Sequence, residues 1–362
     1  MNPFTIDHLP SRTVEHDGRT YLFFSGTSYL GIPQHPRMQA LLAEGIARYG
    51  LHFGSSRNGN LQLAIYEKAE EKLALWTGAA SALTVSSGMI AGQLVVDWLT
   101  NQGTGCRPMV DSDTVVLQAP GTHPALWHPL LRPQQVPFTA EHLLTHLDPA
   151  DQKPLLLLTS SVDAIRGQYA DFSWLPKLSH RPVMLVVDDS HGLGVLNGRR
   201  GIYPTLCALV ERKMPNVQIV VTASLAKAMG LPGGVVLGSS ILIEQLRGTA
   251  YFGACSPMPP AYAHAFVHAG TLYREARARL DRNVALAESL LMPTGLFTHG
   301  SGYPVFYTER HDLYPALLKQ GIFIYSFAYP TPADKPNTRL IISAYHEEDD
   351  IRQLATAVQR VL

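Results

Sequence analysis

A single lysine, Lys227, stands between two apolar runs of the kind that form buried strands. Residues 219–221 (IVV) precede it and residues 235–237 (VVL) follow it, and functional side chains often lie in the loops where such strands end. Its neighbours, from Ser224 to Gly230, are apolar or uncharged, so burial would favour the neutral amine. A neutral amine can attack an aldehyde, although a lysine in a surface loop has the same local sequence.

A second chemical group is predicted at the end of a neighbouring strand. The apolar run 182–187 ends on Asp188, and His191 follows three residues later. Pyridoxal phosphate needs a lysine for its aldehyde and a carboxylate that keeps its ring nitrogen protonated, so that the ring can accept electrons. The two segments together predict an enzyme that uses this cofactor.

Three further segments could complete such a site. His123 follows a predicted strand and a Pro-Gly turn, where an imidazole could stack on a flat ring or be purely structural. Residues 82–98 predict a strand, a Ser-Gly turn and a helix whose first amides could bind a phosphate, although an ordinary helix cap has the same pattern. Arg339 opens the apolar run LIIS and could bind a carboxylate, or could form a surface ion pair with Glu347.

Composition narrows the class of protein. The chain has 362 residues, 46% of them hydrophobic, and its 29 basic residues balance its 29 acidic ones, so no nucleic-acid partner is predicted. Cys106, Cys207 and Cys255 form no CxxC pair, which favours a reducing compartment such as the cytoplasm. No stretch has the length of a membrane span, and His264 and His268 lack the glutamate of HExxH, so no metal site is predicted.

The order of the apolar runs predicts an α/β fold. Strands at 154–159 and 182–187 are separated by a helix-length gap, which indicates right-handed crossovers and a mainly parallel sheet. Residues 36–250 are expected to form a large domain, 251–362 a smaller α/β domain, and 1–35 a segment that packs with the smaller one. The smaller domain is predicted to contain a long connecting helix over 261–291, broken once, strands near 305–307 and 339–343, and helices over 312–320 and 347–362.

Several segments together resemble one enzyme family. VVDDSHGLGVLNGRRG, TASLAKAMGLPGG and RLIISAYH occur in this order, within a resemblance that runs from FSGTSYLGIPQHP to ISAYHEEDDI. They resemble the α-oxoamine synthases, fold-type I pyridoxal phosphate enzymes that include 8-amino-7-oxononanoate synthase, 2-amino-3-ketobutyrate CoA ligase and serine palmitoyltransferase. The resemblance implies a large domain with a mainly parallel seven-stranded sheet flanked by helices, a smaller C-terminal α/β domain, and a homodimer with a shared active site.

The resemblance also implies roles for the residues that would touch the cofactor ring. Lys227 matches the lysine that bonds the aldehyde, and Asp188 matches the partner of the ring nitrogen. His191 matches the donor to the ring hydroxyl, and His123 matches the histidine that stacks on the ring.

The phosphate and the substrate have matching residues as well. Gly88 and Met89 match the pair whose backbone meets the phosphate, and Ser224 matches a hydroxyl that also reaches it. Ser256 falls near a phosphate ligand that the family supplies from the other subunit. Arg339 matches the arginine that holds the carboxylate of the amino acid.

Departures from the family pattern cluster on the substrate side. Thr27 and Ser28 replace Asn-Asp before Tyr-Leu-Gly, Gly92 replaces an asparagine, and Ser160 replaces a glutamate. The run Phe-Ser-Met-Asp-Gly has become residues 163–167 (DAIRG). Use of the cofactor is therefore a firmer expectation than the identity of the acyl donor.

The reaction that the resemblance implies is a decarboxylative condensation. A small amino acid and an acyl thioester, on CoA or on an acyl carrier protein, would give an α-amino ketone. Transamination and a threonine-aldolase-like cleavage need the same lysine, aspartate and arginine, and are the alternative reactions. A non-catalytic subunit of a larger synthase is a third reading.

Overall fold

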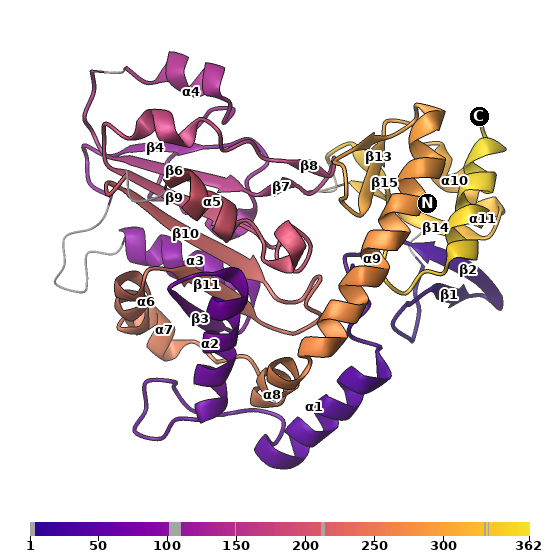
Figure 1. The fold of residues 1–362 in the computed structure, drawn as a ribbon, viewed down its shortest axis with the longest axis horizontal. Coiled ribbons are helices and arrows are strands. Elements are labelled where there is room, and N and C mark those ends of the chain that lie inside the picture. The colour runs from indigo at the N-terminus through magenta and orange to yellow at the C-terminus, as the bar shows by residue number, and fades with distance from the viewer. Residues whose placement is uncertain (1–3, 101–109, 149, 211–213, 329–330, 332) are drawn as a thin grey trace. The chain divides into compact units, whose positions relative to one another are not determined.

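The computed structural model describes residues 4–100, 110–148, 150–210, 214–328, 331 and 333–362, so that Cys106 lies outside the described part. The chain forms two units (Figure 1). The larger comprises residues 37–162 and 170–270, and the smaller comprises 1–36, 163–169 and 271–362. This division differs from the boundary expected after residue 250. Residues 251–270 belong to the larger unit, and the internal segment 163–169 belongs to the smaller one.

The larger unit contains a seven-stranded sheet in the order β3-β11-β10-β9-β6-β4-β5. Strand β11 runs antiparallel to both neighbours, and the pairs from β10 to β5 are parallel, so the predicted mainly parallel sheet is confirmed. The strand bounds are Ser81–Val85 (β3), Val115–Gln118 (β4), Gln134–Gln135 (β5), Leu155–Ser160 (β6), Val183–Asp188 (β9), Val217–Ser224 (β10) and Gly234–Gly238 (β11).

Helices surround this sheet in the larger unit. Their bounds are Pro36–Tyr49 (α1), Ala64–Thr77 (α2), Gly88–Thr100 (α3), Ala140–His146 (α4), Tyr203–Val210 (α5), Ser240–Arg247 (α6), Ala250–Ala254 (α7) and Pro260–His268 (α8). Lys72 of α2 donates to the carbonyls of Phe266 and Val267, each at 2.7 Å, which holds α8 to this unit.

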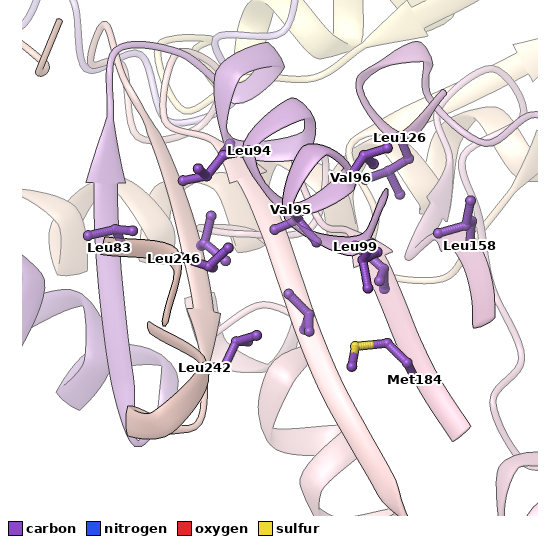
Figure 2. Close-up of a cluster of buried hydrophobic side chains, with 14 of the residues drawn as sticks. Leu83, Leu94, Val95, Val96, Leu99, Leu126, Leu158, Met184, Leu242 and Leu246 are labelled. Atoms are coloured by element: carbon purple, nitrogen blue, oxygen red, sulfur yellow. The ribbon is translucent and has the colours of Figure 1, made fainter. Parts of the chain in front are cut away.

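The core of the larger unit lies between α3 and one face of the sheet. Every residue of β9 is buried, as expected for an apolar run in the middle of a sheet. Alternate residues of the strands, including Leu158 and Met184, pack with Leu94, Val95 and Leu99 of α3 (Figure 2). Burying one such side chain contributes about 1.5–3 kcal/mol, so this cluster holds α3 firmly on the strands.

The smaller unit contains a six-stranded sheet in the order β1-β2-β14-β15-β13-β12. The bounds are Thr13–His16 (β1), Arg19–Phe24 (β2), Thr298–His299 (β12), Val305–Thr308 (β13), Ile322–Ala328 (β14) and Pro336–Ile341 (β15), with helices Gly270–Leu291 (α9), Leu313–Lys319 (α10) and Glu348–Gln359 (α11). A separate two-residue ladder joins β7 (Val162–Asp163) and β8 (Gln168–Tyr169).

Most predicted elements of the smaller unit are present with shifted ends. The expected helix over 261–291 is broken once, at Ala269, so that α8 belongs to the larger unit and α9 to the smaller one. Strand β15 begins three residues before the predicted start at residue 339. Strand β14 was not predicted, although its sequence IFIYSFA is typical of a strand. No helix in the described part of the chain is both long and apolar enough to cross a membrane.

A buried histidine of the smaller unit predicts acid-sensitive stability. His346 is 1% exposed, its Nδ1 accepts from Ser343 N (3.0 Å), and its Nε2 lies 2.9 Å from Phe23 O, to which it donates. Burial lowers the pKa of His346 to about 4. Because the native state favours the neutral ring, its stabilisation is complete above pH ~6.5 and falls by about 3 kcal/mol as the pH drops to ~4.

Acid titration of the unfolding free energy tests this prediction. We expect the His346→Gln protein to lose less stability than the wild type between pH 6.5 and 4. An exposed histidine on α4 provides the control, and the His142→Gln protein should behave as the wild type does. Equal slopes in the wild type and in the His346→Gln protein would contradict the assignment.

Candidate active site

Three strands of the larger unit end side by side. Ser160 of β6, Asp188 of β9 and Thr222 of β10 are register partners across adjacent parallel strands. The carboxyl ends of parallel strands form one edge of a sheet, which is where α/β proteins place their ligand sites. The predicted adjacency of the strands that carry Asp188 and Lys227 is therefore confirmed.

Ser190 connects two of these strand ends. Asp188 is 3% exposed, and its two carboxylate oxygens accept from the backbone N of Ser190 (3.1 Å) and from its hydroxyl (3.2 Å). The same hydroxyl accepts from Ser224 N at 2.8 Å. This bridge holds the Asp188 carboxylate at a defined place beside the end of β10. Sequence reasoning missed Ser190, although an aspartate side chain commonly accepts from the backbone N two residues later in the chain.

His123 lies in the electrostatic field of both predicted ring-binding charges. It caps the 3₁₀ helix η1 (Pro124–Leu126), where its Nδ1 accepts from Ala125 N at 3.1 Å. Burial lowers the pKa of His123, the Asp188 carboxylate raises it, and the Lys227 ammonium lowers it. The backbone N of His123 donates to Ser160 Oγ, and Ser160 is the register partner of Asp188, so His123 lies next to the strand ends at this edge.

The turn after β10 presents Lys227. Ser224 Oγ accepts from Ala226 N (3.2 Å), and Gly230 N donates to Lys227 O (3.1 Å), so the loop is closed on both sides of the lysine. Lys227 is half-buried, as is His191, which follows β9 in a turn. The side chains of both residues are therefore partly accessible to a ligand at the sheet edge.

The first residue of α3 touches the end of β10. A Cβ built on Gly88 would lie 2.5 Å from Ser224 Cβ, so only glycine permits this approach of the helix to the strand. The amides at a helix N-terminus can bind anions, and in α3 one of them, Ile90 N, already donates to Ser87 Oγ at 3.2 Å. Met89, the next residue, is 46% exposed.

The departure at Gly92 has a packing reason. A Cβ at this position would lie 2.5 Å from the carbonyl oxygen of Ala125, which belongs to η1. Gln93 donates from its amide to the same carbonyl at 3.0 Å. Glycine therefore lets η1 rest directly on α3, and this contact sets the position of the adjacent His123, whose backbone N donates to Ser160 Oγ at 3.3 Å.

The remaining two predicted site residues, Ser256 and Arg339, do not belong to the strands and turns that form this edge. Ser256 is exposed in the segment between α7 and α8. Arg339 belongs to the smaller unit and is only 6% exposed, so the alternative of a surface ion pair with Glu347 is wrong. Glu347 instead forms an ion pair with Arg12, with Oε1 of Glu347 3.5 Å from Nη1 of Arg12.

The residues at the sheet edge fit pyridoxal phosphate. The group needs an amine for its aldehyde, a carboxylate for its ring nitrogen and amides for its phosphate. Within one unit, Lys227 supplies the amine, the buried Asp188 supplies the carboxylate, and the N-terminus of α3 at Gly88 supplies backbone amides.

Comparison with known proteins agrees with the resemblance. Residues 28–358 match the family model of aminotransferase class I and II. The chain is 32% identical over 370 residues to 8-amino-7-oxononanoate synthase of Hahella chejuensis, covering 98% of this chain and 91% of the relative. The chain belongs to the α-oxoamine synthase family. The resemblance read from its motifs is confirmed.

Solved structures agree with this assignment at the level of the fold. A serine palmitoyltransferase carrying pyridoxal phosphate has a TM-score of 0.79 at 19% identity, covering 99% of this chain and 92% of that one. The 8-amino-7-oxononanoate synthase of Francisella tularensis has a TM-score of 0.71 at 20% identity, covering 94% and 97%. The expected fold-type I architecture of an α-oxoamine synthase is therefore confirmed.

Proposed function

We propose that this chain is a pyridoxal phosphate-dependent acyltransferase. It condenses a small amino acid with an acyl thioester, and releases a thiol, carbon dioxide and an α-amino ketone. The observation that carries the proposal is a set of contacts at one sheet edge. His123 N donates to Ser160 Oγ, and Ser160 is the register partner of Asp188. The Ser190 hydroxyl joins Asp188 to Ser224, three residues before Lys227. Full-length relatives named 8-amino-7-oxononanoate synthase support the same reaction type.

Four side chains would contact the ring of the cofactor. When bound, pyridoxal phosphate would supply an electron sink for negative charge at the α carbon of the amino acid. Lys227 holds it covalently, and Asp188 holds a proton on its ring nitrogen. His191 donates to the ring hydroxyl, and His123 covers the ring face.

The phosphate of the cofactor would be bound by one end of α3, by a hydroxyl and by a second subunit. The backbone of Gly88 and Met89 and the hydroxyl of Ser224 bind the phosphate, with favourable charge from the N-terminus of α3. Ser256 completes the site of the partner subunit, so the active form is a homodimer. The exposure of Ser256 is compatible with that role. We place the enzyme in the cytoplasm.

The substrate steps use the same residues. Lys227, once displaced by the amino group of the substrate, takes the proton from its α carbon. That carbon attacks the thioester carbonyl, the thiol leaves, the carboxylate departs as carbon dioxide, and the α carbon regains a proton. Arg339 binds the carboxylate before it is lost, and His123 can donate to the thioester oxygen.

An assay of thiol release tests this function. Purified protein is incubated with pyridoxal phosphate, with glycine, alanine or serine, and with acyl-CoAs of increasing chain length. We expect free CoA only when both an amino acid and an acyl-CoA are present. An oxo acid or an aldehyde formed without CoA release would instead identify an aminotransferase or an aldolase. No turnover with acyl-CoA or with acyl carrier protein would favour a non-catalytic subunit.

A further inference from the structure

Arg339 is held between two tyrosines of the smaller sheet. It pairs in register with Tyr307 on β13 and with Tyr325 on β14. The guanidinium carbon lies 4.0 Å from the centroid of the Tyr325 ring, well inside the range of a cation–π contact. Because Arg339 is 6% exposed and Tyr325 is 9% exposed, little water competes with this contact.

A turn from a distant part of the sequence supplies the second support. Nη1 of Arg339 donates to the carbonyl of Ala164, 175 residues away in the chain. The side chain of Asp163 accepts from the backbone N of Ile165 (2.9 Å) and of Arg166 (3.1 Å), and Gly167 N donates to Asp163 O at 2.8 Å. We call residues 163–167 the DAIRG turn. Its internal hydrogen bonds fix the direction of the Ala164 carbonyl.

The DAIRG turn is itself anchored to the smaller unit. Tyr169, two residues after it, donates from its hydroxyl to Ser301 O at 2.7 Å. The Tyr169 ring also meets the ring of Tyr303 edge to face, with centroids 5.8 Å apart. These contacts explain why residues 163–169 group with the smaller unit. The turn is therefore fixed on the same body as Arg339.

The groups that contact the Arg339 guanidinium are neutral. Besides the Tyr325 ring and the Ala164 carbonyl, its field reaches the phenols of Tyr29 and Tyr303, which are fully buried. Burial raises the pKa of both phenols and the Arg339 charge opposes that rise, so both are neutral at pH 7. No ion pair to Arg339 is present within the described residues, and its buried Nε has no hydrogen-bond partner there. A buried cation without a counter-charge strongly favours an anionic ligand.

We propose that Tyr325 and the DAIRG turn are positioning elements, which hold Arg339 as a preformed receptor for the α-carboxylate of the amino acid. This inference rests on the proposed function, in which Arg339 binds that carboxylate. Preformed geometry raises affinity because less side-chain freedom is lost on binding. The residues that replace the family's Phe-Ser-Met-Asp-Gly run then have a role in amino acid recognition, rather than in binding the acyl donor.

Amino acid affinity of the cofactor-loaded protein tests the proposal. We expect the Tyr325→Leu protein to bind its amino acid about 10-fold more weakly, because the cation–π contact that holds Arg339 away from water is lost. The Tyr325→Phe protein keeps the ring and should stay within about 2-fold of the wild type. The dissociation constant is read from the change in the visible spectrum on titration. KM for the amino acid should rise in parallel, with KM for the acyl thioester unchanged.

Asp163→Ala provides a second variant that leaves Tyr325 in place. Loss of the Asp163 carboxylate frees the DAIRG turn, so the amino acid should again bind more weakly. Phe323→Leu is the matched control, because it removes an aromatic ring of the same strand that packs on Phe23 and Tyr314, with centroids 5.7 Å apart in each pair. Wild-type affinity in both the Tyr325→Leu and the Asp163→Ala proteins would overturn the proposal. An equal loss in the Phe323→Leu protein would also overturn it, since the effect would then reflect disturbance of β14.

The Arg339→Lys protein separates this inference from the proposed function. If Arg339→Lys weakens amino acid binding and Tyr325→Leu does not, the positioning role alone is wrong. If Arg339→Lys binds the amino acid as the wild type does, the assignment of Arg339 to the carboxylate is wrong and the inference falls with it. A wild type whose spectrum does not respond to pyridoxal phosphate would overturn the proposed function as a whole.

Discussion

The Lys227→Ala protein is expected to lose turnover by about 10³-fold or more, because both covalent attachment of the cofactor and proton transfer at the α carbon depend on this amine. The visible band of the lysine-bound cofactor should be missing after incubation with pyridoxal phosphate. Thermal unfolding without the cofactor should change little, because Lys227 is half-buried in a turn. Visible spectra and the CoA-release assay measure the two effects.

A second readout of Lys227 does not need the cofactor. The Lys227 ammonium lowers the pKa of His123, so its removal should raise that pKa, as measured by NMR titration of the histidine ring. The Lys177→Ala protein serves as the control, because Lys177 is an exposed lysine of the same unit. It should match the wild type in spectrum, turnover and histidine titration. A Lys227→Ala protein with a normal visible band would rule out the assigned role.

The Asp188→Asn protein is expected to lose turnover by about 10²-fold or more, because the ring nitrogen would lose the charge that keeps it protonated. Asparagine has the same shape as aspartate, and it can still accept from Ser190 N through its remaining carbonyl oxygen. The fold should therefore persist. Without the carboxylate the pKa of His123 should fall, in the direction opposite to the change in the Lys227→Ala protein.

The adjacent aspartate offers a closely matched control. Asp189 is 1% exposed, one oxygen accepts from Ile202 N at 2.8 Å, and burial raises its pKa to about 7. Below pH 7 this group is mainly a neutral acid, which asparagine mimics. The Asp189→Asn protein should keep turnover within a few-fold of the wild type at pH 6. Equal losses at both positions would indicate general damage to the strand end, not a specific role for Asp188.

The chemistry-bearing residues could be predicted because their signals are local. One apolar run ends in Asp188 and another leads to Lys227, and each predicts a buried strand followed by a loop from neighbouring residues alone. Parallel strands then meet at one edge, so the adjacency of the two residues followed from strand order. Strand β14 was not predicted, and its pairing with β2 joins segments about 300 residues apart, which no local pattern specifies.

Only the tertiary structure decided how these residues are supported. The Ser190 bridge joins two strand ends 34 residues apart in the chain, and Arg339 meets the Ala164 carbonyl across 175 residues. Such contacts depend on how separate elements pack, and no local pattern encodes them. The strand ends and the motifs could therefore be predicted from the sequence. The contacts that hold Asp188 and Arg339 in place depend on packing between segments far apart along the chain.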